Sequence, residues 1–182
     1  LAFVAAGCVE KTDPFSTEAY SDLVINEVAA NDGRNYVDTW VEIANNSDQE
    51  KDLSELGLYL FDEYFDGRKI ASFEGKKLQP KEKLVVSTGD ETLNTGFAST
   101  SEFSLVLGLS PDKGVVDQFS RGELGKLPLP GSYQRMPDMT GEWKNTPAAS
   151  KGQENRVLTL ESTKPNAIWL WSSHSAEWIE ND

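Results

Sequence analysis

The sequence contains one cysteine and one histidine among 182 residues, and these two scarce residue types set the first limits on function. Cys8 and His174 stand near opposite ends of the chain. A zinc site draws three or four ligands from His, Cys and carboxylate groups, usually with at least two nitrogen or sulfur donors. A Ser-His-Asp or Cys-His catalytic device would have to use His174, whose neighbours carry no Gly-x-Ser-x-Gly motif. The sequence therefore predicts no metal site, no catalytic residue of this kind and no cofactor.

Basic residues are also few. The chain has 17 Lys and Arg against 30 Asp and Glu, which gives a formal net charge of −13. A surface of this sign repels nucleic acid and anionic lipid, because both carry phosphate charges. The short basic clusters at 76–77 and 81–83 lie among acids and are interpreted as solvated strand ends. We therefore expect no nucleic-acid partner.

The first residues of the chain indicate a targeting signal. Residues 1–6 are all apolar, and the small residues Ala6 and Gly7 precede Cys8. This string resembles the lipobox of bacterial lipoproteins, in which the cysteine is lipidated and becomes the first residue; a buried thiol on a first strand is the alternative. The next residues are polar and acidic, as a tether from a membrane would be. The sequence thus predicts a signal-peptide remnant (1–7), a tether (8–21) and a lipid anchor at Cys8 in the bacterial cell envelope, either periplasmic or surface-exposed.

From Leu23 onward the dominant hydrophobic period is two, which is typical of β-strands. In LVINEV, Leu23 and Ile25 are expected on one face and Val24 and Val28 on the other. Residues that favour tight turns separate the runs, and a long loop is expected over 88–100. No segment shows the i, i+3, i+4, i+7 pattern of a helix. The sequence therefore predicts an all-β fold of two packed antiparallel sheets, with a small barrel as the alternative. Strands are expected at 23–28, 40–44, 57–61, 69–73, 83–87, 103–109 and 114–120.

The order of several motifs resembles the lamin tail domain family of immunoglobulin-like sandwiches. The motifs are the strand LVINEV, the strand WVEIAN before Asp52-Leu53-Ser54, the stretch SYQRMPDMTGEW and the closing TPAASKGQEN. The resemblance covers about Asp22 to Asn155. It implies an immunoglobulin-like antiparallel β-sandwich over 22–155 that acts as an interaction or appended module and not as a catalyst.

Glu42, in the middle of WVEIAN, raises the question of what a carboxylate does inside a strand. Trp40 would share its face, while Val41 and Ile43 take the other face and fill the core. The interpretation that we favour is structural: Glu42 either points outward beside the Trp40 indole, or lies at a sheet margin and bonds to backbone N–H groups of a loop. A metal ligand and a catalytic acid are the alternatives. The acidic loops match no calcium-binding register, so no tight calcium site is predicted. A glycosidase-like carboxylate pair cannot be picked out among 30 acids.

The C-terminal β extension, residues 156–182, contains three of the five tryptophans: Trp169, Trp171 and Trp178. Residues 157–160 and 167–171 both alternate, with a turn at 164–166 between them, which predicts either one extra hairpin or a strand that crosses to a neighbouring molecule. Trp169 and Trp171 would share a face, where they either cap a core or stack on sugar rings.

Three hypotheses for function follow from these features. The first is a non-catalytic structural or interaction module of a lipid-anchored, extracytoplasmic surface protein, with a protein or glycan partner not identified and weak self-association through an edge strand left open. The alternative is a carbohydrate-binding module that uses the late tryptophans. The third is a carboxylate-based hydrolase.

Overall fold

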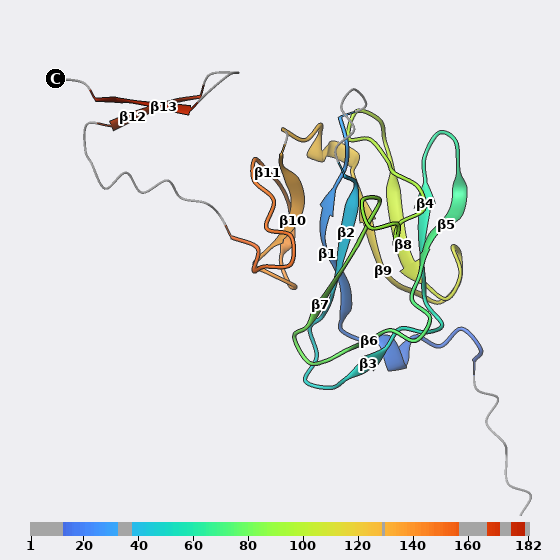
Figure 1. Cartoon of the computed structure of the whole chain (residues 1–182). Coiled ribbons are helices and arrows are strands. Elements are labelled where there is room, and N and C mark those ends of the chain that lie inside the picture. The colour runs from blue at the N-terminus through green and yellow to red at the C-terminus, as the bar shows by residue number, and fades with distance from the viewer. Residues whose placement is uncertain (1–12, 33–37, 129, 157–166, 172–175, 181–182) are drawn as a thin grey trace, which may run out of the picture.

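The computed structural model describes residues 13–32, 38–128, 130–156, 167–171 and 176–180 (Figure 1). Cys8, His174 and residues 157–160 lie outside this part of the chain. The described residues form an all-β structure in which every pair of neighbouring strands is antiparallel. No helix within them has the length and apolar character needed to cross a membrane.

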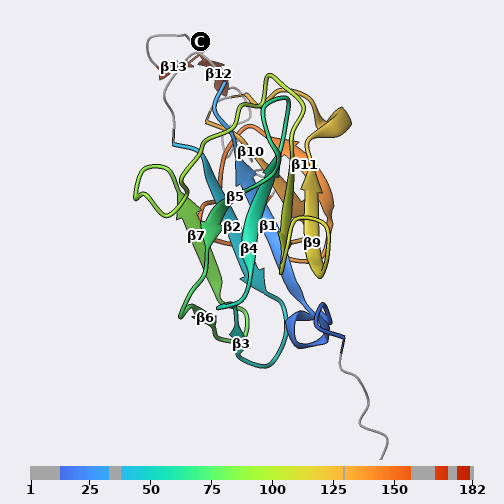
Figure 2. The ribbon, with the colours of Figure 1, turned by 90° about the vertical axis from the view of Figure 1, so that its right-hand side faces the viewer.

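Two sheets face each other and form a sandwich (Figures 1 and 2). The first sheet has five strands, in the order β11 (Glu142–Thr146), β10 (Ser132–Met136), β1 (Leu23–Ala29), β2 (Trp40–Asn45) and β7 (Lys83–Ser87). The second has four, in the order β5 (Asp66–Ser72), β4 (Gly57–Phe61), β8 (Ser104–Gly108) and β9 (Val115–Ser120). The sandwich and its immunoglobulin-like class are as the sequence predicted.

Smaller elements complete the body. A short ladder pairs β3 (Lys51–Asp52) with β6 (Lys77–Leu78), and two single-turn 3₁₀ helices, η1 (Glu18–Tyr20) and η2 (Gly122–Leu124), flank the sandwich. Tyr20 packs against the core, and its hydroxyl donates to Glu55 Oε2 at 3.1 Å. No named strand lies between β7 and β8, which agrees with the loop expected over 88–100.

The core fills the space between the two sheets, because each strand alternates apolar residues toward it. Val41 and Ile43 of β2 are fully buried there, together with Leu58 and Leu60 of β4. This arrangement confirms the prediction that the Val41–Ile43 face of β2 fills the core. Truncation of such a leucine to alanine typically costs 2–5 kcal/mol.

One prediction for β1 was wrong. The register between β1 and β2 shifts between Ile25 and Glu27, which is a β-bulge that inserts one extra residue. Val28 therefore joins Leu23 and Ile25 in the core, instead of sharing a face with Val24. The same bulge leaves Asn26 and Glu27, two successive polar residues, for the outer side.

A hairpin forms in the C-terminal extension, and one of its two strands is the predicted strand 167–171. β12 (Ala167–Trp171) pairs with β13 (Ala176–Glu180), a partner that the sequence analysis did not assign. The predicted partner strand, 157–160, lies outside the described residues. Four residues separate these two strands, β12 and β13, which is a common length for the connection of a β-hairpin.

Candidate functional site: a buried polar network on the outer face of the first sheet

Glu42 lies in the middle of β2, on the face opposite the core, and is nonetheless fully buried. Its Oε1 accepts a hydrogen bond from Asn26 Nδ2 at 2.7 Å and lies 3.1 Å from Lys83 Nζ. Its Oε2 accepts the backbone N–H of Gly152 at 2.7 Å. Residues 147–156, which we call the closing segment, are thereby fixed to the sheet. Of the two structural alternatives, the bond to a loop N–H group is the one that forms, although β2 lies inside the sheet and not at its margin.

Glu27 of β1 is the direct cross-strand neighbour of Glu42 and is also fully buried. Its Oε1 accepts from Ser132 Oγ at 2.6 Å, from Gln134 Nε2 at 2.9 Å and from the backbone N–H of Ser150 at 2.8 Å. Its Oε2 accepts from Ser150 Oγ at 2.7 Å. Glu27 therefore connects β1 to β10 and to the closing segment through uncharged donors.

Asp138, in the connection between β10 and β11, supplies a third carboxylate. Its Oδ1 accepts from Asn26 Nδ2 at 2.9 Å, from Lys83 Nζ at 3.0 Å and from the backbone N–H of Asn155 at 3.2 Å. The orientation of the Asn26 amide is fixed, because its Oδ1 accepts the N–H of Met139 at 2.8 Å. Lys83 is thus shared between Glu42 and Asp138.

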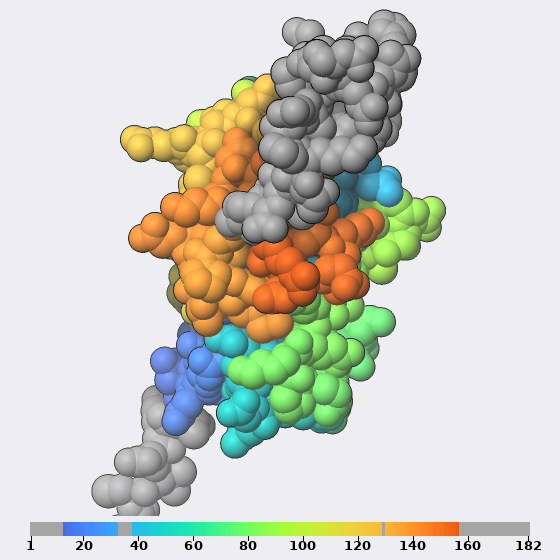
Figure 3. Space-filling view, turned by 90° about the vertical axis from the view of Figure 1, so that its left-hand side faces the viewer, coloured from blue at the N-terminus to red at the C-terminus, as the bar shows by residue number. Residues whose placement is uncertain are grey.

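Asn155 fastens the end of the closing segment. Its Nδ2 donates to the backbone carbonyls of Asn26, at 3.1 Å, and Arg135, at 3.0 Å, while its Oδ1 accepts from Ser150 Oγ at 2.9 Å. The space-filling view shows the closing segment, in red-orange, lying over this outer face (Figure 3). We use the term polar network for the seven side chains that join it to the sheet: Asn26, Glu27, Glu42, Lys83, Asp138, Ser150 and Asn155.

The electrostatics of Glu42 reflect two opposing effects. Burial raises the pKa of Glu42 above its ordinary value, because desolvation penalises the charged carboxylate. The Asn26 amide, the Lys83 ammonium and the Gly152 N–H act in the opposite direction, since each stabilises the carboxylate. Two glutamates side by side on neighbouring strands would repel each other, and the separate donor sets offset that repulsion.

This arrangement is poorly suited to chemistry on a substrate. A general acid or base must come within hydrogen-bond reach of the reacting group. Glu27 and Glu42 are both 0% exposed, and every one of their carboxylate oxygens accepts a hydrogen bond from the protein itself. Among the described residues, no three His, Cys, Asp or Glu side chains are grouped as a metal ion would require. The site is built to hold backbone segments together.

The other candidate residues lie elsewhere. Cys8 is outside the described residues, so its lipidation stays a prediction. In the C-terminal hairpin, Trp169 is the direct cross-strand partner of Trp178, and Trp171 follows two residues later on the same strand as Trp169. The backbone register therefore assigns all three tryptophans to one face of the hairpin.

Sequence reasoning missed Asn26 and Lys83 as partners of Glu42. It also missed Asp138, which bonds to the same two side chains. A signal existed for Asn26, because two polar residues in succession inside LVINEV break the period of two and indicate a bulge. No local signal marks Asp138, which meets Asn26 across 112 positions of sequence.

Comparison with known protein families agrees with this β-sandwich architecture. The family model described as Lamin Tail Domain matches residues 16–123, more than half of the chain. The chain belongs to the lamin tail domain family. No curated protein and no solved structure matches it. Domains of this immunoglobulin-like family are generally non-enzymatic and are typical of interaction modules.

The polar network joins residues beyond the family match to the matched part of the chain. The match ends at residue 123, whereas β10, β11 and the closing segment follow it in sequence. These later elements nonetheless belong to the same body, because β10 pairs with β1 and the closing segment bonds to both buried glutamates. Residues up to Asn155 thus pack in one body with the matched residues, while the predicted domain bounds of 22 and 155 stay a prediction.

Proposed function

We propose that this chain is a non-catalytic structural or interaction module of a lipid-anchored, extracytoplasmic surface protein. The observation that supports the non-catalytic part is the use of both buried glutamates within the fold. Glu42 fixes Gly152 and Glu27 fixes Ser150, so the carboxylates that most resemble catalytic groups in the sequence already have structural partners. Removal of such a group would cost stability and leave no activity to lose.

The support for the anchor comes from the sequence around Cys8. A small residue pair precedes the cysteine, and polar residues follow up to the start of η1 at Glu18. The test is metabolic labelling of the full chain in a bacterial host with an alkyne-bearing fatty acid. Label is expected on the wild-type protein and not on Cys8→Ser.

A matched control variant places the single cysteine at another position of the same region. The double variant Cys8→Ser/Ser16→Cys keeps one cysteine in the same polar region, and it is expected to remain unlabelled because the small residues Ala6 and Gly7 no longer precede the thiol. An unlabelled wild-type chain, or equal labelling of both cysteine positions, would contradict the lipid anchor.

A second candidate function, binding of carbohydrate, is favoured by the register of the C-terminal hairpin. Trp169, Trp171 and Trp178 share one face, and a row of indoles is the geometry that stacks on successive sugar rings. The test is tryptophan fluorescence of the full chain during titration with a panel of soluble polysaccharides. A saturable change that disappears in Trp169→Ala/Trp178→Ala supports it, with Trp143→Phe as the control for a tryptophan of the sandwich. Flat titrations across the panel would exclude this candidate.

A further inference from the structure

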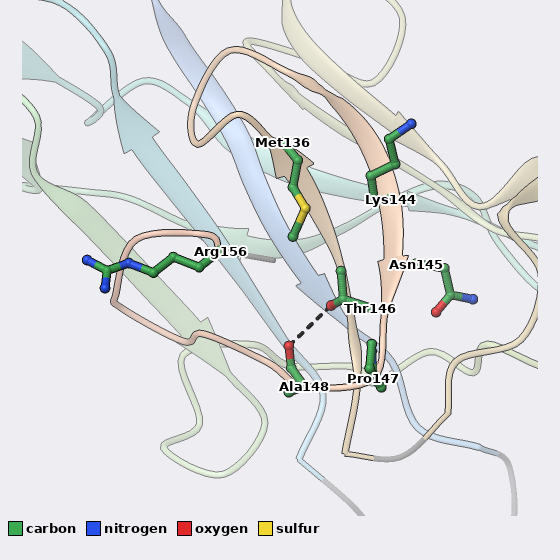
Figure 4. A pocket seen from close by; sticks show the side chains of 7 residues that line it. All are labelled: Met136, Lys144, Asn145, Thr146, Pro147, Ala148 and Arg156. Atoms are coloured by element: carbon green, nitrogen blue, oxygen red, sulfur yellow. Dashed lines mark hydrogen bonds between the residues drawn. The ribbon is translucent and has the colours of Figure 1, made fainter. Parts of the chain in front are cut away.

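A pocket on the outer side of the first sheet is not used by the polar network. It has a volume of ≈ 330 Å³ and is lined by residues of β10, β11 and the closing segment: Met136, Lys144, Asn145, Thr146, Pro147, Ala148 and Arg156 (Figure 4). One wall is fixed by the hydrogen bond from Thr146 Oγ1 to the carbonyl of Ala148, at 3.2 Å. The pocket lies beside β11, which is an edge strand of the first sheet.

The lining combines an apolar floor with a positive rim. Met136, Pro147 and Ala148 supply apolar surface, and Lys144 and Arg156 stand on opposite sides with their charged ends directed outward in Figure 4. The two cations have acidic neighbours, Glu142 at 3.8 Å from Lys144 and Glu154 at 2.7 Å from Arg156. These acids lie outside the lining and are well exposed, so such pairs contribute little and exchange readily.

The C-terminal hairpin has the complementary composition. Its register assigns Ile168, Leu170, Glu177 and Ile179 to the face opposite the tryptophans, because Ile168 pairs with Ile179 and Leu170 with Glu177. We call this the aliphatic face. A two-stranded hairpin is at best marginally stable alone, and both of its faces are largely apolar, so it needs a surface to cover.

The connection between the two is short. The closing segment ends at Arg156, itself a lining residue, and ten residues separate it from β12. Ten residues span at most about 36 Å when extended. Two surfaces joined by about ten residues meet at an effective concentration on the order of millimolar, so even a weak contact is populated within one chain.

We propose that the aliphatic face of the C-terminal hairpin covers this pocket of its own chain. Ile168, Leu170 and Ile179 then lie against the apolar floor, and Glu177 pairs with the positive rim formed by Lys144 and Arg156. The tryptophan face points away from the sandwich and stays available, so this docking holds whether or not that face binds sugar.

The experiment is paramagnetic relaxation enhancement by NMR on the full chain. A spin label on Ser173→Cys, between β12 and β13, in a Cys8→Ser background is expected to broaden amides of β11 and of residues 147–148. Broadening confined to the C-terminal extension, or centred on another surface such as β5, would overturn the proposal. A mixture of labelled and unlabelled copies distinguishes a partner copy as the occupant, which would overturn docking within one chain.

Charge-reversal variants distinguish a loss of docking from a general loss of stability. Glu177→Lys is expected to remove most of the broadening, and the further change Lys144→Glu/Arg156→Glu is expected to restore it. Glu180→Lys is the matched control, since it makes the same charge change on the tryptophan face and should leave the broadening intact. Equal effects of the changes at 177 and 180, or no rescue, would show that the rim does not recognise Glu177.

Discussion

Replacement of each buried glutamate by its uncharged isostere should have very different costs at the two positions. Glutamine keeps the shape of glutamate but replaces one oxygen by a donor, so the outcome depends on which neighbours can accept a hydrogen bond. Glu27 and Glu42 are equally buried and lie side by side, which makes Glu27→Gln and Glu42→Gln a matched pair.

At Glu27 the neighbouring hydroxyl can rearrange its hydrogen bonds after the substitution. The Ser150 hydroxyl has one proton and two acceptors, Glu27 Oε2 at 2.7 Å and Asn155 Oδ1 at 2.9 Å. In Glu27→Gln, the new amide donates to Ser150 Oγ, whose proton turns to Asn155. Oε1 keeps its three donors. We expect a loss of about 0–1 kcal/mol in the free energy of unfolding.

At Glu42 neither orientation of the amide is satisfied. If nitrogen replaces Oε2, it faces the N–H of Gly152; if it replaces Oε1, it faces Asn26 Nδ2 and Lys83 Nζ. Asn26 cannot turn over to help, since its amide also bonds to Asp138 and Met139. An unsatisfied buried donor and a weakened buried ion pair together cost about 2–4 kcal/mol.

Urea unfolding of the full-length variants, followed by near-UV circular dichroism, measures the difference. The denaturation midpoint of Glu42→Gln should fall well below that of Glu27→Gln, at an unchanged m-value. Equal midpoints, or a larger loss at Glu27, would refute the hydrogen-bond reasoning.

Three further outcomes are expected. Asn155→Ala should lower the free energy of unfolding by about 2–3 kcal/mol in the same urea assay, because two backbone carbonyls lose their donor; a loss near zero would argue against the closing segment as part of the fold. Gly152 has φ +78° and open space around its missing side chain, so Gly152→Ala should cost about 1 kcal/mol from backbone strain alone; thermal melting tests this, with Gly125→Ala, at φ +74° and equally open, as the control. The Ser54 hydroxyl and then its N–H lower the pKa of Asp52, so the charge of Asp52 contributes stability above the unfolded pKa, about 3.9, which is lost as pH falls through the folded pKa. The stability gap between wild type and Asp52→Asn should therefore narrow from pH 6 to pH 3, and a gap that widens would contradict that sign.

Much of the sandwich could be predicted from the sequence, because period-two alternation is a local property. Val41 and Ile43 identified the core face of β2 and, by elimination, the outer position of Glu42. The strands β10 and β11 were harder to recognise from period alone, because polar Arg135 and Asn145 alternate with Tyr133 and Trp143 on the inward side. The motif order located them where periodicity did not.

The site was less accessible to prediction than the fold. The role of Glu42 followed from its strand, but its partners Asn26, Lys83 and Gly152 come from three other parts of the chain. Long-range pairs of this kind leave no trace in one sequence. The bulge in β1 places Asn26 and Glu27 against the closing segment. It depends on the register with β2 and therefore on tertiary structure.

Amide hydrogen exchange of the closing segment, measured by NMR on the full chain, tests most directly whether the buried glutamates hold that segment on the sheet. The amides of Ser150 and Gly152 lie outside any strand, yet they donate to Glu27 and Glu42. They should exchange as slowly as amides of β1 and β2, and Glu42→Gln should release Gly152 more than Ser150. Exchange of both amides at the rate of exposed loop positions would contradict the account.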